Sequence, residues 1–126
     1  MTTLKCYCGS LKNFSQCCES YIKGVKKAPT AEALMRSRYS AYATQKADYL
    51  VATTHVSTRK HHKKEDILEW SQSNEWIKLS VLDATINTVT FKAFYLDSTL
   101  HAQIHHEHST FKLEDGSWFY VDGEFY

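Results

Sequence analysis

All four cysteines of the chain lie in one short segment near its amino terminus, which restricts what that end of the protein can be. Cys6 and Cys8 are followed, after eight residues, by the adjacent Cys17 and Cys18. A disulfide stabilises most when it closes a long loop, whereas these residues could close only short ones, and a bond between neighbours 17 and 18 would be strained. One metal ion, by contrast, needs several soft ligands that converge on a point. The spacing therefore predicts a metal centre.

Zinc is the metal that this pattern favours, because four thiolates form a closed tetrahedral structural site. Gly9 and Ser10 directly follow Cys8 and predict a tight turn whose backbone N–H groups donate to a thiolate. Residues 11–21 predict a short helix that carries the second pair of cysteines. The alternatives are four free surface thiols and an iron–sulfur cluster, although the spacing differs from a ferredoxin run. The expected ligands of a structural zinc ion are Cys6, Cys8, Cys17 and Cys18.

The rest of the chain has helical patterns first and strand patterns afterwards. A lysine-rich connector over residues 20–30 holds the only proline and predicts a boundary between a zinc module, residues 1–24, and a main domain, residues 25–126. Thr30 is the expected N-cap of the first long helix. The expected helices cover residues 31–45, 46–55 and 63–73, and the expected strands cover 75–86, 87–97, 99–114 and 118–122, with a hairpin turn at 115–117. This order predicts an α+β fold, with helices packed on one face of a strongly curved antiparallel four-stranded sheet.

Charge and hydropathy restrict the surroundings in which the chain works. Its 15 basic and 14 acidic residues nearly balance, so nucleic acid is not an expected partner. No apolar run is long enough to span a bilayer, and the stretch MTTLKCYC lacks the apolar segment of a secretory signal. Together with reduced thiols, these features predict a cytoplasmic protein without a membrane partner.

Arg38 is the least expected residue of the first long helix. It falls within an apolar stripe at helical spacing that includes Leu34, Met35 and Tyr42. A guanidinium in that position must be paired, because an unpaired interior charge is destabilising by several kcal/mol, about 3–5 when a partner is removed. The third strand offers such a partner.

Alternation along the third strand places His105, Glu107, Ser109 and Phe111 on one face, which changes from polar to apolar as a cone lining does. We expect an Arg38–Glu107 ion pair that holds the helix to the sheet, and this structural role is preferred. The functional alternative is a small-molecule pocket in which Glu107 or a histidine acts as general base. The ligand-pocket candidates are Arg38, Tyr42, Trp76, His105, Glu107, Ser109 and Tyr120.

Other titratable residues are weaker candidates. His106 and His108 alternate with His101 and His105, so a second metal site is not expected on this strand, and residues 61–62 lie in a charged, solvated run. Asp48 could serve as a carboxylate base but is expected to be exposed. Asp122 is expected to satisfy backbone groups at a turn. The catalytic residues therefore stay unassigned.

Several segments resemble a known family. CYCGSLKNFSQCC resembles the SEC-C motif, a small zinc-binding module, and LMRSRYSAY, ADYLVATTH, EWIKLSV, HEHSTF and GSWFYVDGE are similar to the YchJ-like family of uncharacterised bacterial proteins. The sequence departs from that family's pattern at Leu11 and Thr110, and it lacks the second, carboxyl-terminal SEC-C motif of many members. The resemblance implies a SEC-C module joined to a cone-shaped domain of the nuclear transport factor 2-like (NTF2-like), or cystatin-like, superfamily. It implies no single function, since that superfamily includes enzymes, adaptors and dimerisation modules.

Three functions are considered. The preferred one is a non-enzymatic adaptor whose SEC-C-like module contacts a protein partner, with a homodimer formed through the sheet. The second is a small-molecule enzyme or carrier that uses the cone pocket. The third and weakest is binding to nucleic acid or the ribosome through the lysines around the zinc module, which are Lys5, Lys12, Lys23, Lys26 and Lys27.

Overall fold

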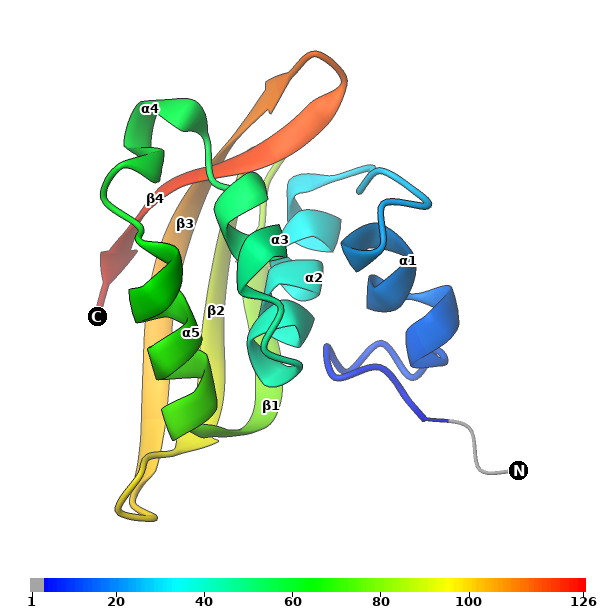
Figure 1. Ribbon diagram of the computed structural model, residues 1–126. Helices are drawn as coiled ribbons and strands as arrows, with labels where there is room; N and C mark the ends of the chain where they lie inside the picture. Colours follow the sequence, from blue (N-terminus) through cyan, green and yellow to red (C-terminus); the bar gives the residue numbers. More distant parts are fainter. Residues whose placement is uncertain (1–3) are drawn as a thin grey trace.

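Helices precede strands in the computed structural model, which describes residues 4–126 (Figure 1). Residues 1–3, part of the stretch read above for a secretory signal and for the zinc module, lie outside the described residues. The helical elements are the 3-10 turn η1 (Phe14–Gln16), α1 (Cys18–Ile22), α2 (Ala31–Ala43), α3 (Ala47–Ala52), α4 (Val56–Arg59) and α5 (Lys64–Ser73). The strands are β1 (Glu75–Ala84), β2 (Thr88–Leu96), β3 (Ala102–Glu114) and β4 (Ser117–Phe125). The predicted α+β class is confirmed, and α4 is an element that the sequence patterns did not indicate.

The four strands form an antiparallel sheet in the order β1-β2-β3-β4, so each strand pairs with its neighbour in the chain. Asp115 and Gly116 connect β3 to β4 with φ values of 52° and 78°. Positive φ at both central residues is typical of the two-residue turn that matches strand twist. The predicted hairpin is therefore present, and the helices pack against one face of the sheet (Figure 1).

Irregular registers change which side chains face the helices. The pairing of β1 with β2 shifts between Trp76 and Lys78, and consequently Trp76 faces inward whereas Ile77 is 54% exposed. Simple alternation along residues 75–86 would place Ile77 on the same face as Leu79 and Val81, but an extra residue in one strand reverses the alternation beyond it. A second shift, between Thr110 and Phe111 in the pairing of β3 with β4, brings both Tyr120 and Gly123 to the inner face.

Helix α2 is the central helix of the fold, because it packs against β1, β2 and β4 and also against α1, α3 and α5 (Figure 1). Its predicted N-cap is confirmed: Oγ1 of Thr30 accepts a hydrogen bond from the backbone N–H of Ala33 at 3.0 Å. Small buried residues such as Ser37 and Ala41 allow neighbouring elements to approach closely. The main core consists of Ala31, Leu34, Met35, Tyr39, Val89, Phe91, Ala93, Phe111 and Tyr120. Among the described residues, the helices are all too short or too polar to cross a membrane.

Candidate metal centre and cavity

The four cysteines converge on one point, as a shared metal ion requires. All four Sγ atoms lie within 4.8 Å of one another, with Cys17 3.8 Å from Cys8 and 4.0 Å from Cys18. Sulfur atoms bound to one zinc ion at about 2.3 Å in a tetrahedron lie about 3.8 Å apart. All four cysteines are free, and three of them are buried. The cluster therefore fits a tetrahedral metal ion.

Neighbouring groups hold the cysteine cluster against α2. The Cys6 Sγ lies 3.6 Å from Oγ of Ser40, and Nη1 of Arg36 donates to the carbonyl oxygen of Cys8 at 2.7 Å. On the outer side, Oγ of Ser10 lies 3.2 Å from Sγ of Cys17, so the turn after Cys8 supports the cluster through a side chain. The segment is thus docked on the main domain and does not project from it (Figure 1).

The protonation of the cluster suits metal binding. Hydrogen bonds from the thiols of Cys18 and Cys8 lower the pKa of Cys6 well below its ordinary value, because they stabilise its thiolate. The same contact with Cys6 raises the pKa of Cys18, which keeps the shared proton. A thiolate is the form of cysteine that binds metal ions. The close approach of the sulfur atoms therefore favours loss of a proton from the cluster, which metal binding requires.

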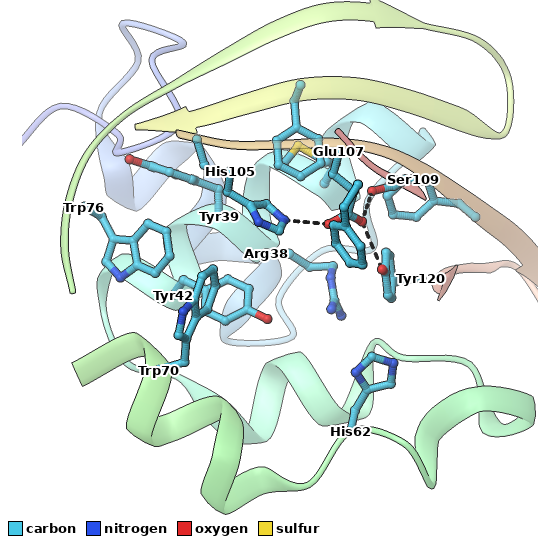
Figure 2. Close-up of a pocket in the computed structure, with 15 residues that line it drawn as sticks. Arg38, Tyr39, Tyr42, His62, Trp70, Trp76, His105, Glu107, Ser109 and Tyr120 are labelled. Atoms are coloured by element: carbon cyan, nitrogen blue, oxygen red, sulfur yellow. Dashed lines mark hydrogen bonds and ion pairs between the residues drawn. The ribbon is translucent and has the colours of Figure 1, made fainter. Parts of the chain in front are cut away.

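A cavity of about 310 Å³ lies between the helices and the inner face of the sheet (Figure 2). All seven pocket candidates predicted from the sequence line it, so the structure brings them together; that they bind a ligand stays a prediction. The complete lining consists of Met35, Arg38, Tyr39, Tyr42, His62, Trp70, Trp76, Phe91, Ala93, His105, Glu107, Ser109, Phe111, Tyr120 and Phe125.

Glu107 is a buried carboxylate with three hydrogen-bond donors. Its Oε1 lies 2.7 Å from Nε2 of His105, and its Oε2 accepts from Oγ of Ser109 at 2.5 Å and from the hydroxyl of Tyr120 at 2.9 Å (Figure 2). Burial alone would raise the pKa of Glu107, but the donors, His105 foremost, hold that pKa below its ordinary value. A Cβ at Gly123 would collide with this carboxylate, so the glycine gives Glu107 its space.

The expected ion pair between Arg38 and Glu107 does not form, since no contact between them falls within the 4.0 Å limit of an ion pair. Nη1 of Arg38 donates instead to the carbonyl oxygen of Leu50 at 2.9 Å and to Oγ1 of Thr53 at 2.7 Å. These acceptors lie at the carboxyl end of α3, where helix carbonyl groups attract a cation. The guanidinium also lies over the ring of Tyr120, with Cζ 4.6 Å from the ring centroid.

Aromatic side chains from α2, α5 and β1 form one wall of the cavity. The rings of Trp70 and Trp76 lie 4.9 Å apart, and Tyr42 contacts Trp70 edge-to-face at 5.3 Å. Trp70 was not among the predicted pocket residues, although the helical stripe of α5 favoured an inward position for its side chain. His62 was not among them either; it was placed above in a solvated run but is in fact half-buried at the cavity. Nothing in the residues around His62 indicates that position.

Burial shifts the pKa values of several titratable groups that line the cavity. It raises the pKa of Tyr39 to about 12, and burial together with the adjacent carboxylate of Glu107 raises the pKa of Tyr120 further above its ordinary value. Burial lowers the pKa of His62, and the charge of Arg38 adds to that effect. At neutral pH the tyrosines are therefore hydroxyl donors, and His62 is neutral.

The remaining candidates lie away from the cavity. Asp48 is exposed as expected, and its Oδ1 contacts Nζ of Lys64 at 2.7 Å. Asp122 was expected at a turn, but β4 continues to Phe125 and Asp122 is exposed within it. His106 and His108 lie on the outer face of β3, and within residues 4–126 the cysteines are the only group of three or more residues arranged to hold a metal ion.

Comparisons with known proteins agree with this architecture. The family model described as YchJ, middle NTF2-like domain, matches residues 30–123. A UPF0225 protein of Streptomyces coelicolor is 40% identical over 99% of this chain and 98% of its own, and the UPF0225 protein YchJ of Shigella dysenteriae is 37% identical over 94% and 81%. The solution structure of a SEC-C motif containing protein from Rhodopseudomonas palustris superposes with a TM-score of 0.88 at 34% identity, covering 96% of this chain and 98% of that one. The crystal structure of a SEC-C motif containing protein from Psychrobacter arcticus has a TM-score of 0.78 at 26% identity, covering 94% and 80%.

Proposed function

The chain belongs to the YchJ (UPF0225) family, and from this premise we propose that it binds a small organic molecule in the cavity of its NTF2-like domain. The cavity itself carries this proposal. Protein interiors are normally packed without voids larger than a water molecule, whereas this one keeps about 310 Å³ open beside buried polar groups. A mostly apolar hollow with a few fixed polar groups is the usual form of a ligand site.

The cysteine module serves this site as an architectural support. Zinc is the ion that four thiolates favour, and a closed four-sulfur site supplies folding stability rather than chemistry. Cys6, Cys8, Cys17 and Cys18 would hold it. Because the cluster contacts Arg36 and Ser40 of α2, which do not line the cavity, a bound ion would fix the helix that forms one wall of the cavity.

The adaptor role predicted for the SEC-C module receives less support. The buried sulfurs face α2, and Leu79 of β1 packs against the cluster as well, so the metal ligands themselves offer no surface to a partner. A homodimer through the sheet is also less favoured, because the middle of its outer face carries Lys92, His106 and His108. The basic cluster around the module stays exposed, and its role in binding nucleic acid stays a prediction.

A second candidate function is proton transfer within the cavity. Because Glu107 is ionised, its Oε1 accepts a hydrogen bond from Nε2 of His105, so in the neutral imidazole Nδ1 carries the lone pair that acts as the base. That base could take a proton from a carbon next to a carbonyl group, and Glu107 would stabilise the resulting imidazolium. Deuterium incorporation into a cavity ligand in D2O tests this role, which predicts incorporation with the wild type and none with His105→Gln.

Filling the cavity tests the proposed function. Ala93 is buried and lines the cavity, so Ala93→Leu inserts three carbon atoms into the open space, while Ala102→Leu makes the same change at an exposed position of β3. A thermal-shift screen of small metabolites should yield ligands that stabilise the wild type and Ala102→Leu but not Ala93→Leu. Circular dichroism checks that each variant folds. Ligands that stabilise all three proteins equally would place binding elsewhere and contradict the proposal.

A further inference from the structure

The hydrogen-bond donors of Arg38 are only partly used by the protein. The residue keeps 8% of its surface exposed, and Nη1 alone serves Leu50, Thr53 and, at 3.4 Å, Oγ1 of Thr54. Nε and Nη2 have no hydrogen-bond partner within residues 4–126. Every fully buried side-chain nitrogen or oxygen in that part of the chain does have one. Nε and Nη2 therefore retain accessible surface.

That accessible surface opens into the cavity, because Arg38 lines it. Figure 2 shows the guanidinium between Tyr42 and Tyr120, on the side where His62 faces the cavity. Nε and Nη2 together form the edge of a guanidinium that donates two parallel hydrogen bonds to the two oxygens of one carboxylate. An unoccupied edge of this kind, on a residue more than nine-tenths buried, is a recognition element for an anion.

The other charged group of the cavity does not compete for this edge. Both oxygens of Glu107 already accept hydrogen bonds, which come from His105, Ser109 and Tyr120. Glu107 thus has three of its roughly four acceptor positions occupied, whereas Nε and Nη2 of Arg38 have no acceptor within the described residues. A ligand that complements this arrangement supplies acceptors and negative charge to Arg38.

We propose that the cavity binds a small organic monocarboxylic acid with a flat apolar body, an inference that rests on the proposed ligand-binding function. The carboxylate contacts Nε and Nη2 of Arg38, and the apolar body packs against Trp70, Trp76 and Tyr42. Aromatic rings arranged edge-to-face offer flat faces that favour a planar group. A second carboxylate on the ligand is disfavoured, because the charge of Glu107 faces the same cavity.

Matched acids and amides test the inference. Benzoate, phenylacetate and trans-cinnamate are compared with benzamide, phenylacetamide and cinnamamide by isothermal titration calorimetry at neutral pH with the full chain. The wild type should bind at least one acid about 10- to 100-fold more tightly than its amide, the range for a charge-assisted pair of hydrogen bonds. Arg38→Met should abolish this preference, whereas Lys60→Met, which removes an exposed charge, should keep it.

The outcomes separate the inference from the function on which it rests. Equal binding of acid and amide by the wild type overturns the inference but leaves the cavity a ligand site, and this comparison holds even if Arg38→Met fails to fold. The inference is also overturned if Arg38→Met folds and still binds the acid more tightly than the amide. If no probe binds, the carboxylate inference is wrong, and the metabolite screen against Ala93→Leu decides separately whether the cavity binds a neutral molecule.

Discussion

The cysteine module and the cavity are built in opposite ways. The module assembles four like groups from a short segment, with sulfur atoms within 4.8 Å of one another. The cavity assembles unlike groups from distant elements: Arg38 from α2, Trp70 from α5, Glu107 from β3 and Tyr120 from β4. The spacing of residues along the chain therefore determines which groups form the cysteine cluster, whereas the topology and register of the sheet determine which groups meet in the cavity. The cysteine cluster is closed by its own ligands, and the cavity is left open.

Helix α2 connects the two regions. Its residues Arg36 and Ser40 contact the cysteine segment, while Arg38, between them in sequence, faces the cavity. Residues two apart on a helix point in different directions, so one helix can serve both sites. If the comparison is correct, changes in the module should affect stability first, and changes at the cavity should affect binding first.

The largest expected effect comes from removing one sulfur ligand. Cys18 is 1% exposed, so Cys18→Ser should lose the bound metal and lower the free energy of unfolding by at least about 3 kcal/mol, since metal binding to such sites is folding free energy. Elemental analysis and urea unfolding measure both effects. Ser15→Ala, at an exposed position of the same segment, is the control. A Cys18→Ser protein with wild-type metal content would contradict the four-sulfur site.

A methyl group at Gly123 should disturb the cavity without touching the module. Gly123→Ala places Cβ against the carboxylate of Glu107, which must move away from its donors. The expected loss of stability is about 1–3 kcal/mol. Glu124→Ala, at the next and exposed position of β4, should leave stability nearly unchanged in the same urea titration. Equal stability of Gly123→Ala and the wild type would show that Glu107 does not need its present position.

The hydrogen bond from Arg36 to the cysteine segment should contribute less to stability than the two features above. Arg36→Met removes the hydrogen bond to the carbonyl oxygen of Cys8 and should cost about 1 kcal/mol of stability, because Arg36 is partly exposed. Hydrogen exchange should increase in the cysteine segment and not at the cavity. Lys23→Met, which removes an exposed cation from the module, is the matched control. Increased exchange throughout β3 would mean that the two regions are not separable.

The smallest expected effect is a dependence on pH. The folded-state pKa of Glu107 lies below its ordinary value of 4.5, so its stabilisation is complete above that pH and is lost as the pH falls through the folded-state value. Stability below about pH 5 should therefore decrease more steeply for the wild type than for Glu107→Gln. In the wild type, His105, Ser109 and Tyr120 donate hydrogen bonds to this carboxylate, and Arg38 lines the same cavity. Identical pH profiles from urea unfolding would contradict an ionised, stabilised Glu107.

The sequence was sufficient where one local rule applied. Alternation along β3 correctly placed His105, Glu107 and Ser109 on the inner face, and Thr30 correctly marked the start of α2. Both rules depend on residues close in sequence, so no knowledge of the remaining fold was needed. The spacing of the four cysteines is also a local feature, and it correctly predicted that their sulfur atoms converge.

The sequence was insufficient where distant elements compete for one group. Arg38 was assigned to Glu107 because opposite charges attract, but the carboxyl end of α3 lies closer and offers carbonyl and hydroxyl oxygens. The exposure of Ile77 and the inward position of Gly123 depend on register shifts, which alternation alone cannot indicate. Such shifts are set by packing across strands.

One measurement tests most directly whether ligands bind at the cavity and leave the module to architecture. The chain has three tryptophans, of which Trp70 and Trp76 line the cavity, whereas Nε1 of Trp118 donates to the carbonyl oxygen of Pro29. Their indole N–H signals are followed in a nitrogen–hydrogen correlation spectrum during titration with trans-cinnamate. The account predicts that the signals of Trp70 and Trp76 shift while those of Trp118 and the cysteine segment stay fixed. Shifts confined to the cysteine segment, or to Trp118, would contradict it.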